Sequence, residues 1–173
     1  MLPPLNNCSL AEQKPVMDLA EEKALADIER VGCHVIHVLA EGDLPPFSYS
    51  VGIQRSAAAP EVIILGLKRE ISHSLVNEYN ERVRDGERFV AGAFYAGFLE
   101  NFDVTFERVD RRHYREHLGW DRWLYSGDEF EVLQLVYPTT SGVWPVWPWG
   151  PDGPVVFGPR QPLLTASGGR EAG

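Results

Sequence analysis

The sequence has few cysteines, no long apolar run and fewer basic than acidic residues. Its two cysteines, Cys8 and Cys33, match no zinc-binding spacing and are too few for a disulfide framework. No apolar run approaches the ~20 residues of a membrane-spanning helix, so we expect no membrane association. The 25 Asp and Glu residues outnumber the 16 Lys and Arg residues, which gives a net charge of −9. Because nucleic acid is bound through Lys and Arg, this balance argues against a nucleic-acid partner.

The remaining composition is that of an ordinary globular domain. A chain of 173 residues, 44% apolar and 24% charged, can bury a core without disulfides or metal. Residues 1–14 predict a disordered lead-in, residues 15–165 a single folded domain, and residues 166–173 a disordered tail. The first seventeen residues are polar and lack the apolar core of a secretory signal, so we expect a cytoplasmic protein.

Three segments have helical patterns. Pro15 opens the first helix, and Gly32 is placed to end it. Residues 70–85 form the second, whose predicted apolar stripe consists of Ile71, Leu75, Tyr79 and Val83. We expect its other side to face solvent, and that side carries His73, Asn77, Asn80 and Glu81. Residues 111–125 predict one or two short helices, broken near Gly119.

The strand patterns lie between and after these helices. Residues 33–39 are largely apolar on both faces, which predicts a central strand. Strands also follow at 47–53, 61–67, 89–102, 104–109 and 130–137, with 54–60 as a surface loop. The order is not a regular βαβ alternation, and the short connection between the second and third strands favours antiparallel pairing. We therefore expect an α+β fold: one domain with a mainly antiparallel sheet, which can be barrel-like, and two or three helices packed on it.

One short motif suggests a metal. His113 and His117 are four residues apart in the pattern H-x-x-E-H, which matches the inverted zincin motif. The third ligand would be Glu129 or Glu131. A charged helix face is the alternative, and we favour it because such a short match arises readily by chance. We therefore predict no metal site.

Several polar and aromatic residues invite more than one interpretation. His34 and His37 point to opposite faces of their strand, so we expect each to have its own partner. Gln134 shares a strand face with apolar residues, and Gln161 precedes the last apolar residues. A buried amide must be hydrogen-bonded, so each either holds a loop backbone or faces a ligand. The tryptophan-rich segment from Trp144 onward can form a strap, a lid or an interface patch.

Four separated blocks carry a family resemblance: GCHVIHVLAEGDLPPFSYSVGI, PEVIILGL, LQLVYPTTSGVWP and QPLL. In this order, over about residues 32–164, they resemble a bacterial family known as domain of unknown function 4262. Cys33, Tyr137 and Thr139 stand where that family usually has tryptophan, tryptophan and aspartate. The resemblance implies a fold neighbourhood and no activity. The residues of this sequence that match the family pattern are His34, Pro46, Phe47, Tyr49, Gly52, Pro60, Glu61, Gly66, Leu67, Gln134, Pro138, Gln161 and Pro162.

The sequence favours a binding domain over an enzyme and identifies no catalytic residue. The candidate ligand-binding residues are His34, Tyr49, Glu61, Gln134, Gln161 and Trp144. We favour a small-ligand-binding module, one form of which is a split barrel that binds flavin mononucleotide, because the element order is similar to that of flavin reductases. The alternatives are an acidic protein-interaction module, such as an inhibitor or immunity-type protein, and a zinc-dependent hydrolase built on His113 and His117. A homodimer is also compatible with the sequence.

Overall fold

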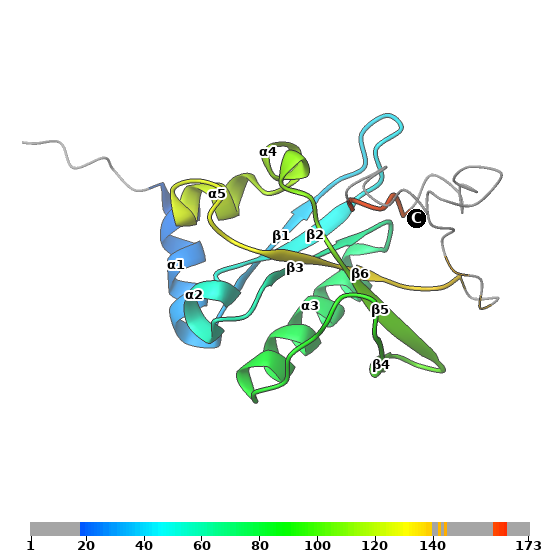
Figure 1. Cartoon of the computed structure of the whole chain (residues 1–173). Helices are drawn as coiled ribbons and strands as arrows, with labels where there is room; N and C mark the ends of the chain where they lie inside the picture. The colour runs from blue at the N-terminus through cyan, green and yellow to red at the C-terminus, as the bar shows by residue number, and fades with distance from the viewer. Residues whose placement is uncertain (1–17, 140–141, 143, 145–160, 166–173) are drawn as a thin grey trace, which may run out of the picture.

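The computed structural model describes residues 18–139, 142, 144 and 161–165. Pro15, the predicted lead-in, the predicted tail and most of the tryptophan-rich segment lie outside these residues. The described strands form one six-stranded sheet in the order β1-β2-β3-β6-β5-β4 (Figure 1). The strands are β1 (His34–Val38), β2 (Phe47–Val51), β3 (Glu61–Leu65), β4 (Phe94–Leu99), β5 (Phe102–Arg108) and β6 (Val132–Val136).

The pairing of the strands confirms the predicted α+β fold. Every pair of neighbouring strands is antiparallel except β3 and β6, which run parallel. Tyr49 lies opposite Ile63, and Ile63 lies opposite Gln134, so three of the sequence blocks occupy adjacent strands. The sheet is open rather than barrel-like, with β1 and β4 at its two edges.

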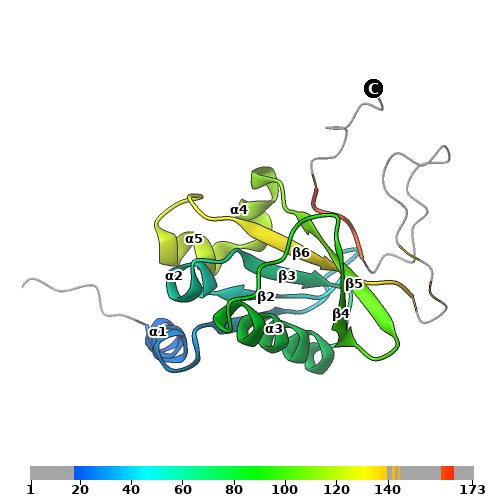
Figure 2. The ribbon, with the colours of Figure 1, turned by 60° about the horizontal axis from the view of Figure 1, so that its bottom comes forward.

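The helices cover both faces of this sheet. They are α1 (Leu19–Val31), α2 (Ile53–Ala57), α3 (Arg69–Arg84), η1 (Arg111–His113), α4 (Tyr114–His117) and α5 (Gly119–Tyr125). Figure 2 shows α3 against one face and α4 and α5 against the other. Gly32 ends α1 and the third helical segment breaks before Gly119, both as predicted. Among the described residues, no helix is long and apolar enough to cross a membrane.

Each face of the sheet has its own apolar core. Along β3, Val62 and Ile64 belong to the core beneath α3, and Ile63 and Leu65 belong to the core beneath α4 and α5. All five residues of β3 are buried, because a central strand with helices on both faces has no solvent-facing side. Full burial of each such aliphatic side chain contributes about 1.5–3 kcal/mol to the stability of the fold.

Two strand and loop predictions are wrong. The strand from Cys33 was expected to be central, but β1 is an edge strand. Its residues 34–37 are half-buried on both faces because α1 and α3 flank it, which gives an edge strand the composition of an inner one. The predicted surface loop at 54–60 contains α2, and Ile53 and Ala59 are buried in the core.

The predicted faces of the second helix need two corrections. Ile71, expected in the apolar stripe, is 42% exposed, whereas Leu75, Tyr79 and Val83 are buried as predicted. Asn80, expected to face solvent, is only 4% exposed. The buried face of α3 is therefore turned toward Asn80, because α3 also packs near the end of α1, where the Asn80 amide donates to the carbonyl of Val31.

Candidate functional site

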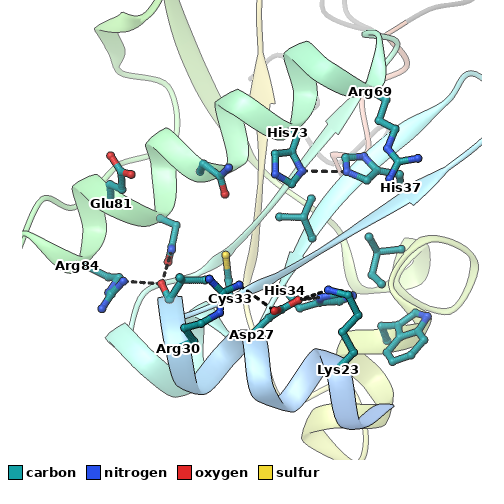
Figure 3. Close-up of a pocket in the computed structure, with 16 residues that line it drawn as sticks. Lys23, Asp27, Arg30, Cys33, His34, His37, Arg69, His73, Glu81 and Arg84 are labelled. Carbon is teal, nitrogen blue, oxygen red and sulfur yellow. Dashed lines mark hydrogen bonds and ion pairs between the residues drawn. The ribbon is translucent and has the colours of Figure 1, made fainter. Parts of the chain in front are cut away.

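A groove of about 800 Å³ lies between α1 and α3, and β1 runs along its floor (Figure 3). Four cationic side chains line it: Lys23 and Arg30 from α1, and Arg69 and Arg84 from α3. Only two carboxylates, Asp27 and Glu81, lie among them. The groove is therefore electropositive, although the chain as a whole carries a charge of −9.

The chain path places the two helices on opposite sides of β1. α1 ends at Gly32, and the chain turns directly into β1, so α1 stays beside the strand. Side chains of a strand alternate between its faces. Cys33 and Val35 accordingly join the core beneath α3, and Ile36 joins the opposite core. The edge of β1 is left facing the groove between these two helices.

Two histidines from different elements meet at one end of the groove. His37 Nε2 and His73 Nδ1 are 3.1 Å apart, and their rings are stacked with centroids 5.3 Å apart. His37 Nδ1 also lies 2.7 Å from the hydroxyl oxygen of Ser48, so a hydrogen-bonded chain connects all three side chains. Burial, reinforced by the charge of Arg69, lowers the pKa of His37. We call His37 and His73 the histidine pair.

Asp27, on the α1 wall, contacts three nitrogen-bearing side chains. Its carboxylate lies 2.9 Å from Lys23 Nζ, 3.1 Å from Arg30 Nη2 and 2.8 Å from His34 Nδ1. Burial alone would raise the pKa of Asp27, but these hydrogen bonds outweigh burial and hold it well below its usual range. Asp27 is thus the shared counter-ion of this wall, whereas Arg69 has no ion-pair partner among the residues that the structure describes.

The far end of the groove is fixed by the last turn of α1. The carbonyl oxygen of Val31 accepts hydrogen bonds from Arg84 Nη1, at 2.5 Å, and from Asn80 Nδ2, at 2.8 Å. These donors satisfy a carbonyl that the helix end leaves open. The amide oxygen of Asn80 is buried and has no hydrogen-bond partner within the described part of the chain.

Of the six predicted ligand-binding residues, only His34 lines this groove. Tyr49 is buried in the core, and its hydroxyl oxygen accepts a hydrogen bond of 3.2 Å from the backbone N–H of Trp120. Glu61 is fully buried, and its carboxylate accepts four hydrogen bonds from within the chain. The donors are the Ser50 hydroxyl (2.5 Å), the Tyr125 hydroxyl (2.6 Å) and the backbone N–H groups of Gly52 (2.9 Å) and Gln54 (3.1 Å).

A second buried acid, which the sequence analysis did not single out, lies near Glu61. Asp121 is fully buried, and neither carboxyl oxygen has a hydrogen-bond partner among the described residues. Burial, together with the charge of Glu61, raises the pKa of Asp121 well above its usual range. Burial raises the pKa of Glu61 as well, but its hydrogen-bond donors oppose that rise, so Glu61 is the better site for a negative charge and Asp121 is the acid that holds its proton more readily.

The two glutamines hold the backbone of the chain. Gln134 donates to the carbonyl of Pro162 and accepts from the N–H of Leu164, both at 2.8 Å. Gln161 accepts from the N–H of Tyr137 and donates to its carbonyl, both at 2.9 Å. Together they attach residues 161–165 beside β6. The observed contacts are those of the backbone-holding alternative, and a ligand role for either glutamine stays a prediction.

Trp144 lies away from the groove. Its ring packs edge-on against Phe94, with centroids 5.3 Å apart. The predicted strap, lid or interface patch extends to residues 145–149, which lie outside the described residues. A ligand role for Trp144 likewise stays a prediction.

The proposed zinc ligands do not gain a third partner. The rings of His113 and His117 are 6.0 Å apart, and their segment is split between η1 and α4 rather than forming one continuous helix. His113 Nε2 accepts a hydrogen bond of 3.3 Å from Arg112. Within the described ranges, no group of three His, Cys, Asp or Glu side chains could hold a metal ion. The arrangement therefore gives the zinc-hydrolase hypothesis no support.

The fold and the groove define a single α+β domain with one electropositive concavity at a sheet edge. The chain belongs to the family described as domain of unknown function (DUF4262), whose pattern matches residues 27–152. The match begins at Asp27 and so includes β1, α3 and most of the groove. Comparisons with curated proteins and with solved structures found no match.

Proposed function

We propose that this domain binds a small anionic ligand in the groove between α1 and α3. The observation that carries the proposal is the gathering of four cationic side chains and three histidines in one concavity of an acidic chain. A concave site of one charge focuses the local potential and attracts ions of opposite charge. The volume of about 800 Å³ lies within the ~300–1,000 Å³ typical of ligand sites.

The charges are spread along the groove rather than gathered at one point. Arg69 and Arg84 lie fifteen positions apart on α3, which corresponds to about 22 Å along the helix axis. Arg69 lies beside the histidine pair at one end, and Arg30 and Arg84 lie at the other (Figure 3). A guanidinium presents two parallel N–H donors that suit a phosphate or carboxylate. This spacing favours a ligand that is elongated or that carries more than one anionic group.

Flavin mononucleotide remains one candidate ligand. Its phosphate would suit Arg69, and its ring would cover the apolar part of the groove around Val35 and Ile36. The acidic interaction module and the homodimer stay predictions, and no observation of the structure favours them over ligand binding.

Isothermal titration calorimetry tests the proposal with inorganic pyrophosphate and with flavin mononucleotide. We expect saturable binding of at least one of them, weakened at least tenfold by Arg69→Gln because the unpaired guanidinium is lost. Arg115→Gln is the matched control, since Arg115 is exposed and lies outside the groove. We expect this control to leave the affinity within twofold of wild type. Equal losses in the two variants, or no saturable binding of either probe, would contradict the proposal.

A further inference from the structure

The edge of β1 that faces the groove is open. β1 pairs only with β2, in five consecutive register pairs without a bulge. Among the described residues, no backbone group of His34–Val38 bonds to any element other than β2. Proteins usually protect sheet edges with bulges, proline or covering segments. The other edge strand, β4, is protected in this way, because its register shifts between Tyr95 and Leu99.

The groove has the shape that an added strand requires. β1 forms the floor, and α1 and α3 form two walls along its length (Figure 3). Five strand residues span about 17 Å, which fits within the ~22 Å between the ends of α3 that carry Arg69 and Arg84. Side chains of a strand added to β1 would alternate between the two walls. Each wall carries two cationic side chains.

The charge of the groove selects the chemistry of the added strand. Two copies of this chain that paired through β1 would bring two electropositive grooves together, and like charges oppose such a contact. An acidic segment instead meets Arg69 and Arg84 on one wall and Lys23 and Arg30 on the other. Main-chain pairing supplies affinity in this recognition mode, and alternate side chains supply specificity.

We propose that the anionic ligand is an extended acidic peptide that pairs with β1 as a seventh strand of the sheet. This inference rests on the proposed function, because it names the class of anion that the groove binds. Its backbone amides would satisfy the open edge of β1, and its carboxylates would lie against the cationic walls.

Alternate N-methylation tests strand addition on the wild-type full chain. The probe is the fluorescein-labelled peptide Glu-Glu-Val-Val-Glu-Glu with blocked ends, which presents glutamates to both walls and is measured by fluorescence anisotropy. One isomer carries N-methyl groups on residues 1, 3 and 5, and the other carries them on residues 2, 4 and 6. Successive N–H groups of a strand point to opposite sides, so only one isomer loses the bonds to β1. We expect that isomer to bind at least tenfold more weakly, and the other to stay within threefold of the unmodified peptide.

Pyrophosphate titration separates the failure of this inference from the failure of the proposed function. If pyrophosphate binds and the peptide does not, or if both isomers bind alike, strand addition is wrong and anion binding stands. If the isomers differ but neither pyrophosphate nor flavin mononucleotide binds, the groove takes the peptide and the proposal of a small ligand falls. If none of these probes binds, both fall. Sedimentation equilibrium gives a further check, because a dimer that Ile36→Pro disrupts would show that a second copy occupies the edge.

Discussion

Replacing Glu61 by glutamine should destabilise this domain more than most single substitutions. The carboxylate is fully buried, and it accepts four hydrogen bonds that join β2, α2 and α5 to β3. Three of these donors point at the same oxygen, Oε1. A glutamine oxygen placed there meets the three donors without a negative charge, and a glutamine nitrogen placed there would face them with its own hydrogens. Either orientation of the glutamine amide weakens this set of hydrogen bonds.

The expected magnitude follows from the charge on the acceptor. A hydrogen bond to a charged acceptor contributes about 1.5–3 kcal/mol and one to a neutral acceptor about 0.5–1.5 kcal/mol, so weakening four of them by Glu61→Gln should lower the free energy of unfolding by about 3–5 kcal/mol. For a domain of this size the corresponding fall in Tm is roughly 10 °C. Tyr125→Phe, which removes one of the four donors, should cost about 1–2 kcal/mol. Urea denaturation followed by circular dichroism measures both, and a loss below 1 kcal/mol for Glu61→Gln would refute the reasoning.

Three further predictions address the backbone, a buried acid and the groove. Gly52→Ala should lower the free energy of unfolding, measured by urea denaturation, more than Gly86→Ala does. Both glycines have φ near +100°, but only at Gly52 does an added Cβ meet a side chain, at 2.6 Å. Equal losses of stability in the two variants would count against this. Burial raises the folded-state pKa of Asp121 above its unfolded value of ~3.9. The free energy of unfolding of wild type should therefore fall relative to that of Asp121→Asn as the pH rises from 5 to 8. Parallel profiles of stability against pH in the two proteins would exclude this. Sulfate, which keeps its charge between pH 7.5 and 5.5, should bind wild type more tightly at the lower pH, because His37, whose pKa is lowered by burial, gains a proton as the pH falls. His37→Gln should remove most of that gain in calorimetry.

The main elements of the fold could be predicted because their signals are local. The apolar run at Glu61–Leu65, the glycine after α1 and the apolar positions 75, 79 and 83 of α3 each depend on neighbours in the sequence. The edge position of β1 could not be predicted, because it depends on which strands pair. α2 was missed because Gly52 and the small residues after it are typical of loops. Its helical turn is held by Glu61, an acceptor that comes seven residues after Gln54.

The groove was beyond prediction for a related reason. His37 and His73 are 36 residues apart and form a pair only because α3 packs across β1. The polar side of α3 was expected to be solvated, and its residues at 73, 77, 80 and 81 line the groove. The family positions Glu61, Gln134 and Gln161 instead hold backbone segments in place. The observed contacts of these three side chains are therefore those of residues that hold the fold together, and a ligand role for them stays a prediction.

The wrong prediction for β1 bears on the peptide hypothesis. Two apolar faces are typical of a strand that is covered on both faces, which is common for inner strands, and the sequence of β1 therefore predicted a central position. In the isolated domain this apolar surface is only partly buried, since residues 34–37 are half-buried, and one edge of β1 has no partner strand among the described residues. A strand added in the groove would place β1 between two neighbours and bury both its open backbone groups and more of its side-chain surface. The flanking helices account for the apolar faces of β1, so strand addition would satisfy its open backbone edge, and an N-methyl scan that showed no alternation would mean that this edge accepts no added strand.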